Sequence, residues 1–279
     1  STVVFLHAHP DDDTLMTGGT MARLAAEGHR VVLITATDGA AGLTASTTIS
    51  TRTLASVRRE ELQRSITALG VARLVLLGYA DSGLDGNGTP STAGLDRQSD
   101  VPFTHVATEA AASKVAAILE EETADVLVGY DAAGGYGHPD HKQVHRVARL
   151  AAQMTPAVML LEATLPREPL ARAVTGAHHL RRIIPALGGL DPATWSVAHT
   201  PRADITHRVN VRRFADVKRA AIAAHASQQA ADRDVRTLEV LLRLPRPAFR
   251  LLLGWEWYVG PRSARTRYVT HPLAKTAKS

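Results

Sequence analysis

The sequence predicts a Rossmann-like, doubly wound α/β fold built on a mostly parallel sheet. Through about the first 165 residues, short apolar runs alternate with stretches of helical periodicity, and Gly28 and Gly70 end two of those stretches. Such alternation is typical of βαβ units with right-handed crossovers. Beyond about residue 166 it weakens. We therefore expect one domain over residues 1–279, with a Rossmann-like core at 1–165 and a less regular C-terminal elaboration at 166–279.

The expected strands and helices follow from two apolar patterns. Short runs rich in valine, leucine and isoleucine predict buried strands, at residues 3–6, 31–35, 74–77, 126–128 and 158–161. Apolar residues spaced three and four apart predict helices, at residues 17–27, 52–69, 108–121 and 140–153. Small and polar residues predict loops at 40–51 and 80–102. The second loop is long for a plain connection, as binding loops often are.

The C-terminal third gives weaker patterns. Residues 209–211 are a candidate strand, and residues 214–229 have the periodicity of a helix. Residues 238–253 mix leucine and arginine around two prolines, and residues 180–203 match neither pattern. For these two segments no element is predicted.

Composition excludes several classes of protein. Cysteine is absent, so disulfides and thiol nucleophiles are excluded, and any metal must take nitrogen and oxygen ligands. The opening run at residues 3–6 is too short for a secretory signal, and no apolar stretch reaches transmembrane length. We expect a cytoplasmic protein, which the absence of cysteine fits.

The charge pattern indicates the kind of partner. The formal net charge is +5, but the basic residues are scattered, with the densest cluster between Arg243 and Lys278. Aromatic residues make up only 4% and form no ladder on which bases could stack. We expect a small-molecule partner and neither a nucleic acid nor a membrane. The sequence leaves open whether the chain forms a homo-oligomer.

Two short polar segments each lie close to the end of an apolar run. Residues 8–13 read Ala-His-Pro-Asp-Asp-Asp, and residues 134–141 read Gly-Gly-Tyr-Gly-His-Pro-Asp-His. In an open α/β sheet, ligands bind beyond the carboxyl ends of the strands where the strand order reverses. If the first and fourth strands are neighbours there, the two segments face each other. They then supply three metal ligands and a separate base, as metal-assisted hydrolysis requires.

These two segments also carry a family resemblance. The chain resembles the PIG-L/LmbE family of zinc-dependent N-acetylglucosamine de-N-acetylases, whose marks are Ala-His-Pro-Asp-Asp-Glu and His-Pro-Asp-His; Asp13 stands in place of the usual Glu. The glycine-rich loop at 134–137 is most similar to members that act on N-acetylglucosaminyl-inositol. The likeness is strong over residues 1–150 and patchy beyond. Further similar positions are Arg58 with Glu61, residues 78–83, 225–228 and 256–259.

The resemblance implies a zinc site formed by His9, Asp12 and His141. Two imidazoles and one carboxylate leave a fourth position for water, as in catalytic zinc sites. The same ligands also accommodate Fe²⁺, Co²⁺ or Ni²⁺. Asp11 is implied as the general base, a carboxylate beside the metal that takes a proton from the water.

The resemblance further implies how the remaining charges are handled. Tyr136 would donate to the developing oxyanion. His138, as an imidazolium held in orientation by Asp140, would stabilise the same charge and pass its proton to the departing amine. Asp13 would support the motif from behind the ligands.

Ordinary explanations compete with some of these roles. Residues 11–13 would also serve to cap the helix expected at 17–27. His145 follows His141 by one helical turn, a spacing that can chelate zinc, but a packing or surface role is favoured for it.

The proposed substrate contacts also have ordinary explanations. Arg58 and Asp81 are candidates for binding substrate hydroxyls or phosphate, although a helix-surface arginine and a turn aspartate are common. His225 and Gln228 share one helical face and would equally serve as hydrogen bonders at the edge of the core.

The expected function is a metal-dependent N-deacetylase, a hydrolase of linear amides that removes acetyl from an N-acetylglucosamine-type amino sugar. The sugar would be a glycoside of inositol or of a natural product. Two different functions remain open: an amidase of the same family that cuts a larger acyl group or a thiol S-conjugate, and a non-catalytic sugar- or metal-binding relative. A dinucleotide-binding enzyme is disfavoured, because carboxylates follow the first strand and would repel a pyrophosphate.

Overall fold

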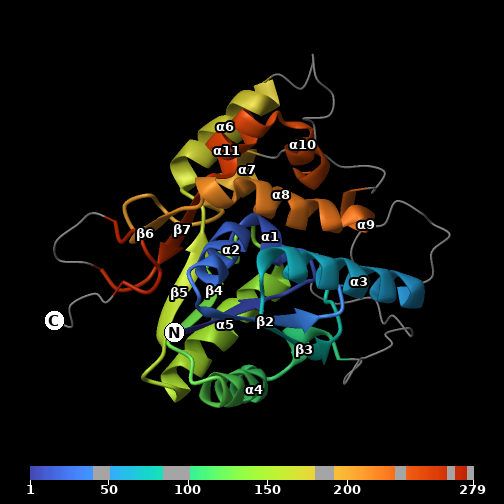
Figure 1. Ribbon diagram of the computed structural model, residues 1–279, viewed down its shortest axis with the longest axis vertical. Coiled ribbons are helices and arrows are strands. Elements are labelled where there is room, and N and C mark those ends of the chain that lie inside the picture. Colours follow the sequence, from blue (N-terminus) through green and yellow to red (C-terminus); the bar gives the residue numbers. More distant parts are fainter. Residues whose placement is uncertain (40–50, 84–100, 180–191, 230–236, 263–267, 275–279) are drawn as a thin grey trace.

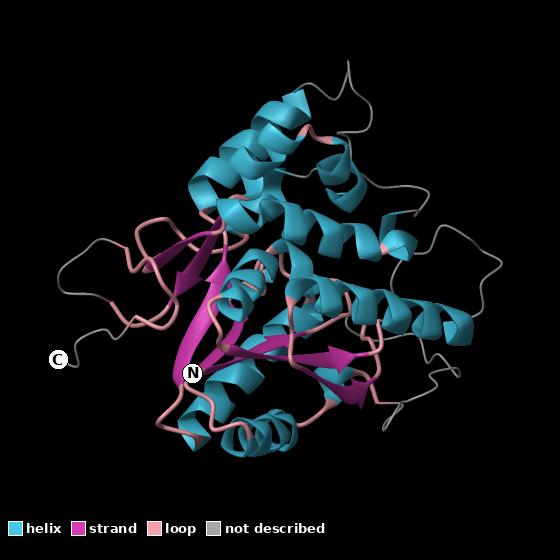
Figure 2. Cartoon of the chain, in the orientation of Figure 1, coloured by secondary structure: helices cyan, strands magenta, loops and turns pink. Residues whose placement is uncertain are grey.

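The structure is a computed structural model that describes residues 1–39, 51–83, 101–179, 192–229, 237–262 and 268–274. Within these residues, helices flank one sheet with the strand order β3-β2-β1-β4-β5-β7-β6 (Figures 1 and 2). The strands are β1 (Thr2–His7), β2 (Arg30–Thr37), β3 (Arg73–Tyr79), β4 (Val126–Tyr130), β5 (Met159–Thr164), β6 (His207–Asn210) and β7 (Trp255–Val259). Most of the two loops predicted at 40–51 and 80–102 lies outside the described residues.

The first five strands run parallel, as their alternation with helices predicts. β1 pairs with β2 on one side and with β4 on the other, so the strand order reverses between β1 and β4. The C-terminal third extends the same sheet, because β7 pairs antiparallel with β5, and β6 pairs antiparallel with β7. The mostly parallel α/β fold is therefore confirmed.

Alternate residues of the strands bury themselves on opposite faces of the sheet. Val4 and Leu6 of β1 belong to one buried cluster, with residues of α4 (Thr108–Glu121) and α5 (Pro139–Met154). Val3 and Phe5 belong to the other, with residues of α2 (Gly18–Ala26), α3 (Thr51–Leu69) and α8 (Ala215–Ala224). The helices of the first part of the chain are α1 (Asp12–Leu15), α2 (Gly18–Ala26), α3 (Thr51–Leu69), η1 (Phe103–His105), α4 (Thr108–Glu121) and α5 (Pro139–Met154).

The C-terminal helices explain why patterns were weaker there. The helix predicted at 214–229 is broken at His225, where φ is −87° and ψ is 58°, into α8 and α9. The unassigned segment 238–253 is two helices, because the backbone of Pro245 and Pro247 suits the start of a helix and not its continuation. These helices are α6 (Arg167–His179), α7 (Pro192–Val197), η4 (Arg212–Phe214), α8 (Ala215–Ala224), α9 (Ala226–Gln229), α10 (Thr237–Arg243) and α11 (Arg246–Leu253).

Among the helices of the described ranges, none combines the length and the apolar character that a membrane crossing needs.

A buried histidine in β6 makes acid stability a testable property of the fold. His207 is 0% exposed, and burial lowers its pKa from 6.5 to about 4. As pH falls below 6.5, the unfolded chain therefore binds a proton that the folded chain does not. Between pH 7 and pH 4, this histidine should lower the free energy of unfolding by up to about 3 kcal/mol.

Urea unfolding across this pH range checks the prediction. The His207→Gln variant keeps a polar side chain beside Thr206 but cannot titrate, so its stability should fall less steeply on acidification than that of the wild type. Equal slopes for the two proteins would assign the acid sensitivity to other groups, such as His7 and His199, whose pKa values burial also lowers to about 4.

Candidate metal centre and active site

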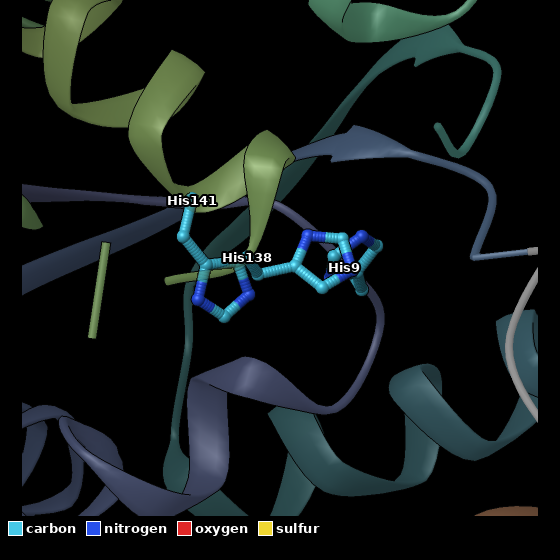
Figure 3. Close-up of side chains that lie close together, drawn as sticks. All are labelled: His9, His138 and His141. Carbon is cyan, nitrogen blue, oxygen red and sulfur yellow. The ribbon is translucent and has the colours of Figure 1, made fainter. Parts of the chain in front are cut away.

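The sheet brings the two polar segments together. β1 and β4 are parallel neighbours in the register Val3↔Val126 to Phe5↔Val128, so both end at the same edge. Residues 8–11 follow β1 and lead into α1. Residues 131–138 follow β4 and lead into α5. The expectation that the segments face each other is confirmed: Figure 3 shows the rings of His9, His138 and His141 gathered side by side.

The glycines of the second segment fold it back onto the first turn of α5. Gly134 and Gly135 have φ values of 64° and 65°, which glycine adopts without strain. A β-carbon at Gly134 would lie 2.8 Å from the backbone nitrogen of Lys142. The Gly135 amide donates to the Asp131 carboxylate over 3.0 Å, and its carbonyl accepts from the amide of His199 over 2.8 Å. Gly135 thus ties the middle of the loop to Asp131 at its start and to His199.

Of the three predicted zinc ligands, the two histidines lie close to the same carboxylate oxygen of the third, Asp12. Asp12 Oδ2 lies 3.1 Å from His9 Nδ1 and 3.1 Å from His141 Nε2. Both imidazoles are buried. The two histidines strongly lower the pKa of Asp12 against the opposing effect of burial, so this carboxyl is ionised, as a metal ligand must be. Two nitrogens and one carboxylate oxygen are a donor set that zinc accepts.

The other nitrogen of His9 contacts two further carboxylates. His9 Nε2 lies 3.2 Å from Asp140 Oδ2 and 3.5 Å from Asp81 Oδ1. Histidine ligands commonly donate their second N–H to a carboxylate, which fixes the ring. Ligand atoms of His9, Asp81 and Asp140 also lie within 4.8 Å of one another, as do those of His9, His138 and His141. The centre therefore has more donors than one metal ion needs.

Asp140 differs from the role expected for it. Its carboxylate accepts from the amide of Ser82 over 3.0 Å and faces His9. Its contact with His138 is through the backbone: the Asp140 amide donates to His138 Nδ1 over 3.2 Å. In the neutral ring that this contact requires, the proton sits on Nε2. Burial and the nearby His9 and His141 lower the pKa of His138 to about 4. This contact and the lowered pKa both favour a neutral His138 ring, whereas the resemblance implies an imidazolium.

Asp11 and Tyr136 stand beside the ligands. Burial and the adjacent Asp12 raise the pKa of Asp11, while Arg58 opposes the shift. Tyr136 is 43% exposed, and its ring centre is 5.3 Å from that of His141. Burial of the hydroxyl and the nearby carboxylate of Asp12 raise the pKa of Tyr136, so the phenol keeps its proton and can donate it in a hydrogen bond.

The two candidate substrate residues lie near this centre. Arg58 is 2% exposed and donates from Nη1 to the carbonyl of Gly39; its Nε and Nη2 have no partner among the described residues. Arg58 is therefore buried beside the site and is not an ordinary arginine on a helix surface. Asp81 follows β3; although burial opposes the shift, His9 and the Gly83 amide hold the pKa of Asp81 well below its usual range.

Hydrogen bonds decide between capping, packing and metal binding for residues 11–13 and for His145. In the first turn of α2, the amides of Gly19 and Thr20 donate to Glu256 over 2.8 and 2.7 Å, and the helix has no side-chain cap. The interpretation of residues 11–13 as caps for this helix is therefore wrong.

His145 Nδ1 lies 3.1 Å from the carbonyl of Tyr130 and 3.0 Å from Glu162. Its packing role is thereby favoured over metal binding.

Residues that the sequence did not single out hold His141 in place. The ring of Tyr130 stacks on that of His141 with centres 4.3 Å apart and planes 10° apart. The Tyr130 hydroxyl is 2.8 Å from His7 Nδ1, and His7 Nε2 is 2.8 Å from the hydroxyl of Thr17. A histidine and a tyrosine at the last positions of β1 and β4 were the available signal.

Comparison with known sequences agrees with this geometry. Residues 4–152 match the PIG-L family, described as GlcNAc-PI de-N-acetylase. The 1D-myo-inositol 2-acetamido-2-deoxy-alpha-D-glucopyranoside deacetylase of Thermobifida fusca (strain YX) is 36% identical over 251 residues, covering 82% of this chain and 83% of that protein. The protein of the same name from Saccharomonospora viridis is 34% identical over 238 residues, covering 81% of this chain and 84% of that protein.

Solved structures show the same fold at lower identity. The N,N'-diacetylchitobiose deacetylase from Pyrococcus horikoshii superimposes with a TM-score of 0.55 at 22% identity, covering 93% of this chain and 82% of that chain. The 4-carboxy-2-hydroxymuconate hydratase from Pseudomonas putida KT2440 does so with a TM-score of 0.60 at 16% identity, covering 98% and 100%. A deacetylase and a hydratase share this fold, so the fold alone does not fix the reaction. The family match and the identity of over 30% across four fifths of the sequence do fix the relationship: this chain belongs to the PIG-L family.

Proposed function

We propose that the chain is a zinc-dependent N-deacetylase acting on an N-acetylglucosamine-type amino sugar, carried as a glycoside of inositol or of a natural product. The observation that carries the proposal is the contact of His9 and His141 with the same oxygen of Asp12, next to Asp11. The names of the two inositol-linked relatives support the sugar. A small-molecule substrate and a cytoplasmic location are part of the same proposal.

The distance from Asp12 to each of the two imidazoles suits a shared zinc ion. The two distances of 3.1 Å between Asp12 and the imidazoles are close to the roughly 3.4 Å that separates neighbouring ligands in a tetrahedral zinc site. His9, Asp12 and His141 would hold the ion, and no thiolate competes for it in a chain without cysteine. The chemistry that zinc supplies at such a site is Lewis-acid polarisation of the acetyl carbonyl and acidification of a water molecule.

The neighbouring side chains would then handle the protons and the charge. Asp11 accepts a proton from the attacking water while the water oxygen bonds to the acetyl carbon. His138 Nε2–H and the Tyr136 hydroxyl donate hydrogen bonds to the oxyanion that forms. When the C–N bond breaks, Asp11 returns its proton to the amine nitrogen, and acetic acid and the free amino sugar leave.

The sugar itself would be bound by Arg58 and Asp81. The Arg58 guanidinium lies buried next to the motif with Nε and Nη2 unpaired among the described residues, and hydroxyl or phosphate oxygens would satisfy both donors. Asp81 provides carboxylate oxygens at the end of β3 for sugar hydroxyls. Together they would place the acetamido group over His9.

Release of free amine by the zinc-loaded protein tests this function. N-acetylglucosaminyl-inositol should be deacetylated; N-acetylglucosamine should react more slowly, because it lacks the aglycone. A chelator should abolish turnover, and added zinc should restore it. Turnover that survives removal of all divalent metal would refute the mechanism. Turnover of only a thiol S-conjugate would refute the substrate and favour an amidase that cuts such conjugates.

A further inference from the structure

A buried carboxylate lies directly behind the proposed metal ligand. Asp13 follows Asp12 in the first turn of α1 and is 1% exposed. Its Oδ2 accepts a hydrogen bond of 2.9 Å from the hydroxyl of Ser65 in α3. Its Oδ1 has no hydrogen-bond partner among the described residues and lies 3.6 Å from Nε2 of His225.

His225 is itself rigidly held. It is 0% exposed and sits at the break between α8 and α9, where its amide donates to the carbonyl of Ile222 over 3.2 Å. Two residues later, the amide and the hydroxyl of Ser227 each donate to Glu61 over 2.7 Å, which ties the break to α3. Among the described residues, the ring nitrogens of His225 have no hydrogen-bond partner. The charged group that faces the ring is the carboxylate of Asp13, 3.6 Å from Nε2.

The helix that ends at His225, α8, also holds the other end of α1. Lys218 lies seven residues before His225, on the same side of α8, and its Nζ donates to the carbonyl of Leu15 over 2.6 Å. α8 thus contacts α1 at both ends, at Asp13 and at Leu15. Because α1 carries Asp12, these contacts fix the position of a proposed metal ligand.

We propose that His225 is a positioning residue that acts through Asp13 to hold Asp12 at the metal. The inference rests on the proposed function. Ser65 of α3 donates to one oxygen of Asp13, and His225 at the end of α8 faces the other, so contacts from two helices restrict both the place and the rotation of α1. The separation of 3.6 Å exceeds a hydrogen bond, so the Asp13 carboxylate reaches Ser65 but stops short of His225. One more methylene, as in glutamate, would close this gap.

The test measures zinc affinity by chelator competition, independently of turnover. His225→Asn should weaken zinc binding about 10- to 100-fold, the usual effect of losing a residue that orients a ligand. Asp13→Glu should tighten zinc binding in the wild-type background and change it little in the His225→Asn background. Ile118→Val, on the buried face of α4 and away from the site, is the matched control: it should lower the thermal midpoint but leave zinc affinity unchanged.

The outcomes separate two failures. If His225→Asn lowers the thermal midpoint and leaves zinc affinity as in Ile118→Val, His225 is only a core residue and the inference is wrong. If His225→Asn does not fold, Asp13→Glu still decides: tighter zinc binding supports the inference, and unchanged or weaker binding overturns it. A wild-type protein that binds no zinc refutes the proposed function instead.

Discussion

Asp11→Asn is expected to lower kcat about 10²- to 10⁴-fold while zinc stays bound. The asparagine keeps the size of the side chain but cannot accept the proton of the attacking water or return it to the amine. Asp11 is not needed for metal binding, because the oxygen shared by His9 and His141 belongs to Asp12. KM for the acetylated sugar should change little, since the lost interaction acts in the transition state.

Two further variants make this result specific. Asp12→Asn, the neighbouring carboxylate, should lose zinc as well as turnover. Asp216→Asn, on the surface of α8 with a side chain 48% exposed, should change neither. Zinc content measured on the purified proteins, together with amine release, checks all three. An Asp11→Asn enzyme with kcat within a factor of about five of the wild type would remove Asp11 from the role of base.

The parallel core could be predicted because its signal is local. The central strands β1, β2 and β4 are buried on both faces and therefore read as continuous apolar runs, whereas β3 and β5 are buried only in part. The position of the centre follows from the same signal, since β1 and β4 carry the motifs and meet where the strand order reverses. β7 is different: its exposure alternates along Trp255–Val259, and its pairing with β5 joins residues about 95 apart in the chain.

The contacts that orient the ligands could not be predicted from spacing. His9 and Asp140 are separated by 131 residues, and only the folded sheet shows that the Asp140 carboxylate meets His9 and not its neighbour His138. The link from Asp13 to His225 spans even more chain. One local signal was present: Lys218 shares the buried face of α8 with Ala215, Ala221 and Ile222, where a charge needs a partner.

That partner makes Lys218→Met the variant with the largest expected loss of stability. Lys218 is 0% exposed, and its ammonium lies 2.7 Å from Glu256 Oε1. Glu256 also accepts from the amides of Gly19 and Thr20, so it must stay close to α2 when the ammonium is lost. A buried carboxylate without its cation costs about 3–5 kcal/mol. Urea unfolding at pH 7 measures the loss.

Lys218→Met with Glu256→Gln separates the charge from the packing. The double variant removes both charges of this pair, and the glutamine oxygen still accepts from an α2 amide, so it should recover part of the stability that Lys218→Met alone loses. Equal losses in the single and double variants would mean that packing dominates. Lys218 also holds the carbonyl of Leu15 at the end of α1. Because neither variant retains this contact, both should bind zinc more weakly than the wild type even where folding is restored.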